Sequence, residues 1–182
     1  MATEPVKRVL LLRHAKSSWK DPDLTDHDRP LARRGREAAK LMAGYLRQHR
    51  MSPALVLCSS AARATQTLDH LTPVLRGSEV RIEAGLYDAS GRDLLDRLRE
   101  VPEPTASVML IGHNPAIEDL AGQLAGRGSA LERMAGKFPT GALAALEFSG
   151  RWRNLGPGKG RLADFATPGD LDPRVTKGSS PP

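Results

Sequence analysis

The chain has 182 residues, of which 40% are hydrophobic and 4% are aromatic, a composition typical of one globular domain with a core of its own. Its 27 Lys and Arg outnumber its 21 Asp and Glu, and the formal net charge of +6 favours anionic ligands without choosing among them. Because aromatic residues are few and none interleave with basic residues along a strand, we expect no nucleic-acid binding. The single cysteine, Cys58, excludes an intrachain disulfide and a cysteine-based zinc cluster.

The N-terminal segment lacks the pattern of a targeting or anchoring sequence. Residues 1–5 contain no charged region followed by a long apolar stretch. No run in the chain approaches the roughly 20 apolar residues that span a bilayer. We therefore expect a cytoplasmic protein that does not enter a membrane.

The first half of the chain alternates short apolar runs with longer amphipathic segments. A short aliphatic run bounded by polar residues predicts a buried strand, and apolar residues at three- and four-residue spacings predict an amphipathic helix. Ser59 and Ser60 can cap the second of the expected helices. The expected elements are strands at 9–12, 55–58 and, more weakly, 80–82, with helices at 31–50 and 61–75.

The second half continues this alternation and then changes in composition. Pro102 stops one expected helix, and Pro115 suits the first turn of the next. After Phe165 the sequence lacks the apolar residues that would anchor it to a core. The expected elements are helices at 91–99 and 115–124, strands at 107–111 and 142–148, and a flexible tail at 167–182.

Alternating strands and helices predict the class of fold. Parallel neighbours in a sheet need crossover connections, and helices supply them. The sequence therefore predicts an α/β fold, with a mixed, mostly parallel sheet covered by helices on both faces. We expect a single domain over residues 1–166.

Basic or imidazole side chains follow three of the expected strands. Arg13 and His14 come after the first strand, Arg63 after the second and His113 after the fourth. The carboxyl ends of parallel strands lie at one edge of the sheet, so these residues are expected to converge there. Two guanidinium groups can hold phosphate oxygens through forked, charge-assisted hydrogen bonds. On the tripeptide 13–15 alone, an ordinary surface Arg and His at a strand end would be an equal alternative.

The chemistry expected of this cluster is phosphoryl transfer. A neutral imidazole can attack phosphorus, and His14 is the candidate nucleophile because its strand-end position directs it to the centre of the pocket. His113 is the candidate electrostatic partner and should be protonated beside a dianionic substrate. Helices expected to begin near Ser60 and Pro115 would add backbone N–H donors.

Four segments resemble the histidine phosphatase superfamily. Arg13-His14-Ala15 is similar to the Arg-His-Gly signature, and residues 59–67, Ser-Ser-Ala-Ala-Arg-Ala-Thr-Gln-Thr, are similar to the second block of the family. Residues 112–115, Gly-His-Asn-Pro, resemble the third block, and residues 31–35 resemble a helix start of the Leu-Thr-x-x-Gly type. The likeness spans residues 7–148. Segments 13–19, 26–31 and 112–115 look most like the SixA-type phosphohistidine phosphatases.

This resemblance implies an activity and a set of site residues. It implies hydrolysis of phosphohistidine, in a protein or peptide, through a phosphohistidine intermediate at His14. Arg13, Arg63 and His113 would complete the phosphate pocket, with no metal and no cofactor. The expected partner is a phosphorylated protein or a small phosphorylated substrate, and the sequence makes no prediction about the oligomeric state.

The chain departs from the superfamily at the position of its usual proton donor. Many relatives carry a glutamate three residues before an aromatic residue, and here Ala84 stands three residues before Tyr87. Glu83 and Asp88 flank the region and are candidate proton donors, with solvent as the alternative. Because an N-phosphorylated imidazole is already a labile donor, the absence of an aligned acid favours a phosphoramidate substrate.

Other polar residues near the motifs are weaker candidates. The possible substrate-binding residues are Lys16, Ser17, Lys20 and Asn114. A solvated loop explains the first three equally well, and Asn before Pro is also an ordinary turn residue. His27, His49 and His70 are expected to be structural or exposed, and Cys58 is expected to be an inert, buried thiol.

Two other functions compete with phosphohistidine hydrolysis. One is a phosphatase of small-metabolite phosphate esters, in which Glu83 or Asp88 supplies the proton. The other is a non-catalytic module that binds phosphorylated partners. The second alternative has no use for a nucleophile, and the presence of His14 argues against it.

Overall fold

A computed structural model describes residues 5–126, 132, 134 and 137–176 of the chain. The strands are β1 (Val6–Arg13), β2 (Leu55–Ser59), β3 (Glu79–Glu83), β4 (Ser107–Gly112), β5 (Leu143–Ser149) and β6 (Arg161–Ala166). The α-helices are α1 (Arg33–Gln48), α2 (Ala62–Leu71), α3 (Gly91–Arg99), α4 (Ala116–Ala125), α6 (Pro168–Leu171) and α7 (Pro173–Thr176). Short 3₁₀ helices lie at Thr72–Val74, Ala84–Leu86 and Trp152–Asn154.

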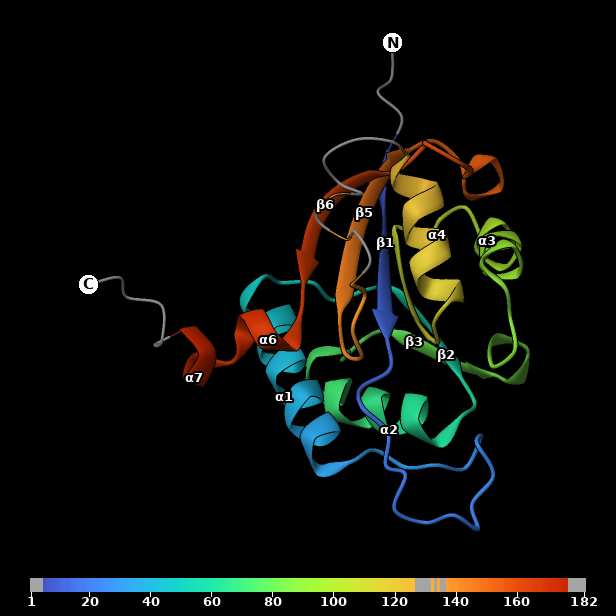
Figure 1. Ribbon diagram of the computed structural model, residues 1–182. Coiled ribbons are helices and arrows are strands. Elements are labelled where there is room, and N and C mark those ends of the chain that lie inside the picture. The colour runs from blue at the N-terminus through green and yellow to red at the C-terminus, as the bar shows by residue number, and fades with distance from the viewer. Residues whose placement is uncertain (1–4, 127–131, 133, 135–136, 177–182) are drawn as a thin grey trace.

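The strands form one six-stranded sheet in the order β3-β2-β4-β1-β5-β6. β1, β2, β3 and β4 are parallel to one another. β5 pairs with β1 in antiparallel orientation, and β6 pairs with β5 in antiparallel orientation. Helices cover both faces of this sheet, with α1 and α2 on one side and α3 and α4 on the other (Figure 1). The predicted α/β class, with a mixed and mostly parallel sheet, is confirmed.

Alternation along β1 divides the core between the two faces. Val9 and Leu11 pack into the cluster that contains α3 and α4, whereas Leu10 and Leu12 pack into the cluster of α1 and α2. Successive side chains of a strand point to opposite faces, so a strand covered on both sides is apolar at every position. This is why the continuous run 9–12 predicts the buried centre of the sheet.

α1 crosses close to the loop that follows β1. A Cβ atom added to Gly35 would lie 2.1 Å from the carbonyl oxygen of Lys16. The amide of Ala32 also donates to that oxygen, at 2.9 Å. Glycine therefore permits the backbone of α1 to approach the loop that carries the residues after His14.

The end and the N-cap of α2 differ from the sequence-based expectation. α2 ends at Leu71, and the chain continues as the 3₁₀ helix Thr72–Val74 rather than as a longer α-helix. Pro73 has no N–H to donate, which explains the change. Ser60 does not cap α2, because the N-cap position is Ala61, whose own side chain has no polar atom to form a cap hydrogen bond.

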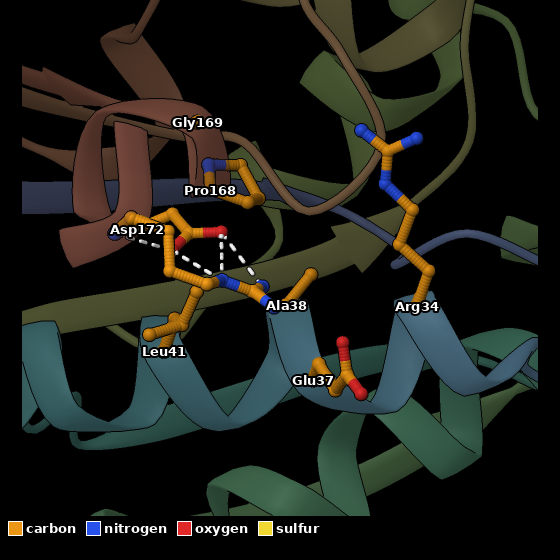
Figure 2. Close-up of a pocket in the computed structure, with 8 residues that line it drawn as sticks. Arg34, Glu37, Ala38, Leu41, Pro168, Gly169 and Asp172 are labelled. Atoms are coloured by element: carbon orange, nitrogen blue, oxygen red, sulfur yellow. Dashed lines mark hydrogen bonds and ion pairs between the residues drawn. The ribbon is translucent and has the colours of Figure 1, made fainter. Parts of the chain in front are cut away.

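The C-terminal part of the chain contains a strand and two short helices that were not expected from the sequence. β6 was not expected from the sequence, because its exposed and half-buried positions interrupt the apolar pattern, yet it pairs with β5 at the sheet edge. Residues 168–176 of the expected tail form α6 and α7, and residues 177–182 lie outside the described residues. A capping box between Thr167 and Asp170 starts α6. Figure 2 shows Pro168 of α6 above Ala38 and Leu41 of α1, which explains how this segment is held.

Among the described residues, no helix is both long enough and apolar enough to cross a membrane.

Candidate active site

The ends of three adjacent strands place the predicted residues side by side. In the sheet, β4 lies between β2 and β1. Arg13, the last residue of β1, is in register with Gly112 of β4, and the amide of His14 donates to the carbonyl of Gly112 at 3.0 Å. His14 and His113 therefore leave neighbouring strands at the same level, with ring centroids 5.0 Å apart.

His14 is a buried imidazole with a defined tautomer. Its residue exposure is 7%, and its Nδ1 lies 2.7 Å from the carbonyl oxygen of Ala15. A carbonyl oxygen only accepts, so Nδ1 carries the proton and Nε2 carries the lone pair. Burial is the main cause that lowers the pKa of His14 to about 3, and the nearby His113, Arg63 and Arg13 contribute to the same shift. His14 is consequently neutral at physiological pH, as a nucleophile must be.

Arg63 joins His14 to the loop between β1 and α1. It is the second residue of α2, and its Nε donates to His14 Nε2 at 3.3 Å. Its other two nitrogens donate to Asp26, from Nη1 to the backbone carbonyl at 2.6 Å and from Nη2 to the carboxylate at 3.0 Å. The guanidinium group is thus fixed at both ends beside His14.

His113 faces His14 from β4 and is held by β2. Its Nε2 lies 2.7 Å from the hydroxyl of Ser59, the buried last residue of β2. Burial is the main cause that lowers the pKa of His113 to about 4, and Arg63 contributes to the same shift. His113 is therefore neutral near pH 7 in the ligand-free chain, whereas the predicted protonated form applies to the complex with a dianionic substrate. A dianion placed between the two rings would act in the opposite sense and favour the imidazolium.

Unpaired polar atoms collect at this edge of the sheet. Within the described residues, the buried side-chain atoms without a hydrogen-bond partner are Arg13 Nε, His113 Nδ1 and Asn114 Oδ1. All three belong to residues that end β1 or follow β4. A buried polar group without a partner costs roughly 1–3 kcal/mol, and such groups are common where a ligand binds. Two of the three are N–H or ring nitrogen atoms, which suit an anion.

Of the weaker candidates, Ser17 and Asn114 are engaged in protein contacts. The hydroxyl of Ser17 accepts from Arg29 Nη1 at 3.3 Å. The amide nitrogen of Asn114 donates to Glu118 at 2.9 Å and to the carbonyl of Phe138 at 3.2 Å. That same carbonyl accepts from Arg13 Nη1 at 2.8 Å, so Asn114 helps to fix the surroundings of Arg13.

The two candidate lysines are exposed on the surface. Lys16 is exposed and lines a surface cavity with Arg34 and Thr140 rather than contacting His14. Lys20 is also exposed, and its backbone amide donates to the Ser18 hydroxyl at 3.3 Å. Among the hydrogen bonds and ion pairs of the described residues, none joins either ammonium group to His14.

Of the two candidate proton donors, Glu83 is bound to an arginine and Asp88 is exposed to solvent. Glu83 accepts two hydrogen bonds from Arg97 of α3, at 2.8 and 2.7 Å. Asp88 is exposed. No hydrogen bond or ion pair of the residues that the structure describes joins Glu83 or Asp88 to His14 or His113.

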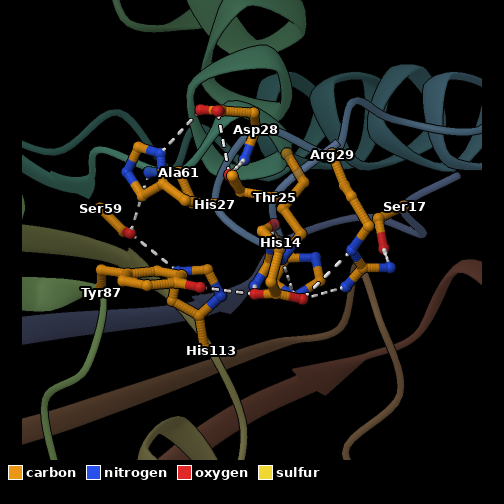
Figure 3. A network of polar contacts seen from close by, with 12 residues as sticks. His14, Ser17, Thr25, His27, Asp28, Arg29, Ser59, Ala61, Tyr87 and His113 are labelled. Carbon is orange, nitrogen blue, oxygen red and sulfur yellow. Dashed lines mark hydrogen bonds and ion pairs between the residues drawn. The ribbon is translucent and has the colours of Figure 1, made fainter. Parts of the chain in front are cut away.

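The structure adds site neighbours that sequence reasoning missed. Asp26 and Tyr87 contact each other, with the Tyr87 hydroxyl donating to the Asp26 carboxylate at 2.6 Å (Figure 3). The Tyr87 ring packs edge-on against both His113 and His27, at centroid distances of 5.5 and 4.9 Å. His27 is thus at the rim of the site rather than elsewhere on the surface. The only signal for this group was the run Asp26-His27-Asp28-Arg29, which carried the resemblance but no assigned chemistry.

The first two amides at the start of α2 donate to other groups of the protein. The amide of Ala61 donates to the Ser59 hydroxyl at 3.3 Å, and the amide of Ala62 donates to the carbonyl of His27 at 2.9 Å. These amides are therefore not free to receive an anion, contrary to the expectation for a helix starting near Ser60. The hydroxyl of Ser60 instead lies 2.9 Å from His27 Nε2.

Two side chains of α2 attach the helix to the strand-end loops. The Thr67 hydroxyl accepts from the amide of Ala15 at 3.0 Å, and the Gln66 carbonyl accepts from the amide of Leu31 at 2.8 Å. These residues belong to the block that resembles the family, and in the structure they hold the backbone next to His14. Their contribution is to placement rather than to chemistry.

Cys58 is an inert thiol in the centre of β2. It is fully buried, and burial raises its pKa to about 12. A thiol in this state supplies no thiolate at neutral pH. In the same described part of the chain, no cluster of three His, Cys, Asp or Glu side chains could hold a metal ion.

Comparisons with known proteins agree with this geometry. The family model of the histidine phosphatase superfamily (branch 1) matches residues 9–107. An uncharacterised protein of Mycobacterium tuberculosis is 37% identical over 161 residues, which cover 86% of this chain and 99% of that protein.

Solved structures of two bacterial proteins are similar over most of the chain. A candidate phosphohistidine phosphatase SixA from Agrobacterium tumefaciens superimposes with a TM-score of 0.79 at 32% identity, covering 90% of this chain and 98% of that one. A second candidate SixA, from Nakamurella multipartitia, has a TM-score of 0.78 at 29% identity and covers 92% and 99%.

Proposed function

This chain belongs to the histidine phosphatase superfamily, and on that premise we propose that it hydrolyses phosphohistidine in a protein or peptide through a phosphorylated His14. Membership of this superfamily supports a phosphatase activity for the chain. The observation that carries the proposal is the neutral, buried His14, whose Nε2 faces Arg63 at 3.3 Å and whose ring lies 5.0 Å from that of His113.

In the first step, the lone pair of His14 Nε2 attacks the phosphorus atom of the substrate. The P–N bond to the substrate imidazole breaks as the new P–N bond forms, and its electron pair goes to the departing ring nitrogen. Solvent protonates that nitrogen. The reaction needs a neutral nucleophile, and the lowered pKa of His14, about 3, keeps its Nε2 unprotonated.

Arg13, Arg63 and His113 stabilise the charge on the equatorial phosphoryl oxygens. Arg63 Nε now donates to His14 Nε2, and during the reaction it would donate to a phosphoryl oxygen that approaches the same atom. The unpaired nitrogens Arg13 Nε and His113 Nδ1 supply further polar contacts at this edge. A phosphate dianion favours protonation of His113, which then acts as a cationic donor.

In the second step, the oxygen of a water molecule attacks the phosphorus atom of phospho-His14. The P–Nε2 bond breaks and its electron pair returns to Nε2, while the proton lost by water goes to solvent. Inorganic phosphate leaves and the imidazole is restored. His14 Nδ1 keeps its proton throughout, because it donates to Ala15.

The choice of a phosphoramidate rests on the leaving group. Alkoxide leaving groups need an acid near the scissile bond, whereas the imidazole of phosphohistidine leaves readily. Ala84 occupies the position of the usual glutamate, and Glu83 is paired with Arg97. The names of the two SixA-like structural neighbours point to the same substrate class.

The test compares two substrates on purified protein. Released phosphate is measured with a peptide that carries phosphohistidine and with p-nitrophenyl phosphate. We expect turnover of the phosphohistidine peptide, a clear preference for it over the ester, and an acid-labile phosphoenzyme in a rapid quench. His14→Ala should abolish all three signals.

His49→Ala is the matched control, since it removes one imidazole from the C-terminal end of α1, where it stacks on Tyr45. It should behave as the wild type. Turnover by His14→Ala at the wild-type rate would overturn the proposal. A higher kcat/KM for the ester than for the phosphohistidine peptide would instead select the small-metabolite phosphatase.

A further inference from the structure

Asp26 makes an unusually dense set of contacts beside the nucleophile. It lies in the loop between β1 and α1, and its carboxylate accepts hydrogen bonds from three side chains. Oδ1 accepts from Arg29 Nε at 3.1 Å and Nη2 at 2.5 Å, and Oδ2 accepts from Arg63 Nη2 at 3.0 Å and the Tyr87 hydroxyl at 2.6 Å. These donors come from the loop itself, from α2 and from the segment after β3.

These contacts determine the direction in which Arg63 points. Asp26 binds both terminal nitrogens of Arg63, one through its carboxylate and one through its backbone carbonyl. A guanidinium group is planar and rigid, so fixing its terminal edge also fixes the direction of its Nε–H. In the structure, that N–H points at His14 Nε2. Without the carboxylate, rotation about the side-chain torsions of Arg63 would move the N–H away from the reacting atom.

The second half of the site is also joined to Asp26. Tyr87, which donates to the carboxylate, packs its ring edge against His113. Figure 3 shows the Tyr87 ring beside the His113 ring. The Asp26 carboxylate therefore binds both Arg63, which contacts His14, and Tyr87, which contacts His113. An ordinary surface ion pair would contact only one of these two groups.

Asp26 cannot itself supply a proton to the leaving group. The hydrogen bond from Tyr87 and those from Arg29 and Arg63 hold the pKa of this carboxyl well below its usual range, so it stays ionised. Its side chain is 51% exposed, so it is not needed to fill the core. The remaining role is orientation of the groups that bind it.

We propose that Asp26 is a positioning residue, which holds Arg63 so that its Nε–H meets the phosphoryl group at His14. This inference rests on the proposed phosphoryl transfer at His14. Arg29 anchors the carboxylate from the opposite side, since its own guanidinium group is buried against Ser17 and stacks on Trp19 at 3.5 Å.

The test removes the charge and keeps the size. In Asp26→Asn, the backbone carbonyl still accepts from Arg63, but the ion pair with Nη2 is lost. Loss of one aligned donor to a phosphoryl transition state lowers kcat by roughly 10²–10³-fold, and a partly misaligned donor should lower it by about 10–100-fold. KM should change less, because the positive charge of Arg63 stays in the site. Asp26→Glu, which keeps the charge, should recover part of kcat.

Asp23→Asn is the matched control, because it removes an exposed carboxylate from the same loop. A second measurement follows Arg63 directly. The Nε–H resonance of Arg63, identified by its loss in Arg63→Lys, should be protected from solvent exchange in the wild type and in Asp23→Asn. It should lose this protection in Asp26→Asn.

Two results would overturn the inference. One is a kcat of Asp26→Asn within threefold of that of Asp23→Asn. The other is a protected Arg63 Nε–H in Asp26→Asn, whatever its kcat. Failure of the proposed function is a separate result, in which the wild type releases no phosphate from the phosphohistidine peptide; the resonance still decides the role of Asp26 in that case.

Discussion

The depressed pKa of His14 predicts how the stability of the protein depends on pH. In the unfolded chain the imidazole titrates near 6.5, whereas burial in the folded protein lowers the pKa to about 3. At pH values between about 3 and 6.5, His14 is protonated in the unfolded state and neutral in the folded state. The free energy of unfolding therefore falls as the pH is lowered through 6.5, and this loss is complete only near pH 3.

The size of the effect follows from the width of that window. Each pH unit between the two pKa values changes the free energy of unfolding by about 1.4 kcal/mol. Between pH 8 and pH 5, His14 should therefore lower the stability of the wild type by about 2 kcal/mol. His14→Asn removes this contribution, and the asparagine amide can still donate to the carbonyl of Ala15.

The assay is urea denaturation of the wild type and of His14→Asn at pH 8 and at pH 5. The stability of the wild type relative to the variant should fall by about 2 kcal/mol at the lower pH. His113 is present in both proteins and its contribution cancels to a first approximation. A relative stability that is the same at both pH values would show that His14 titrates normally in the folded protein and would refute the reasoning.

Three further substitutions test other parts of the structure. Glu83→Gln should leave ester and phosphohistidine turnover within threefold of the wild type, because Glu83 is bound to Arg97; a loss of about 10²-fold or more would identify it as the proton donor. Gly35→Ala should lower the free energy of unfolding by about 1–3 kcal/mol, since its Cβ would overlap the carbonyl oxygen of Lys16 at 2.1 Å, and urea denaturation at wild-type stability would contradict this. Trp152→Ala should cost about 3–5 kcal/mol in the same assay, because the ring is fully buried and its Nε1 donates to a backbone carbonyl; a cost below 1 kcal/mol would mean that the ring is not a core residue.

Local sequence was sufficient for the elements that carry the nucleophile. Continuous apolar runs identify the central strands, because a strand covered on both faces is apolar at every position. Once the strands are parallel, their carboxyl ends share one edge, and Arg13, His14, Arg63 and His113 must approach one another. The four residues could therefore be chosen together before any contact between them was known.

The last strand and the helix after it were harder to predict from the sequence, because each is stabilised by the element that it packs against. β6 is an edge strand with an interrupted apolar pattern, and it is stabilised by pairing with β5. α6 has too few residues to be stable alone, and it is held by a capping box and by packing on α1. The local sequence of β6 and of α6 therefore does not distinguish either segment from a loop.

The amino-acid sequence by itself determined the α/β class, the position of His14 at the end of a strand and the arginines and histidine that accompany it. Only the tertiary structure decided which side chains control those residues. Asp26 contacts Arg63 and Tyr87 across 37 and 61 positions of the chain, and such contacts depend on the path of a loop that has no periodic pattern. The pKa of His14 is likewise a property of burial, which comes from the surrounding layers and not from the residue type.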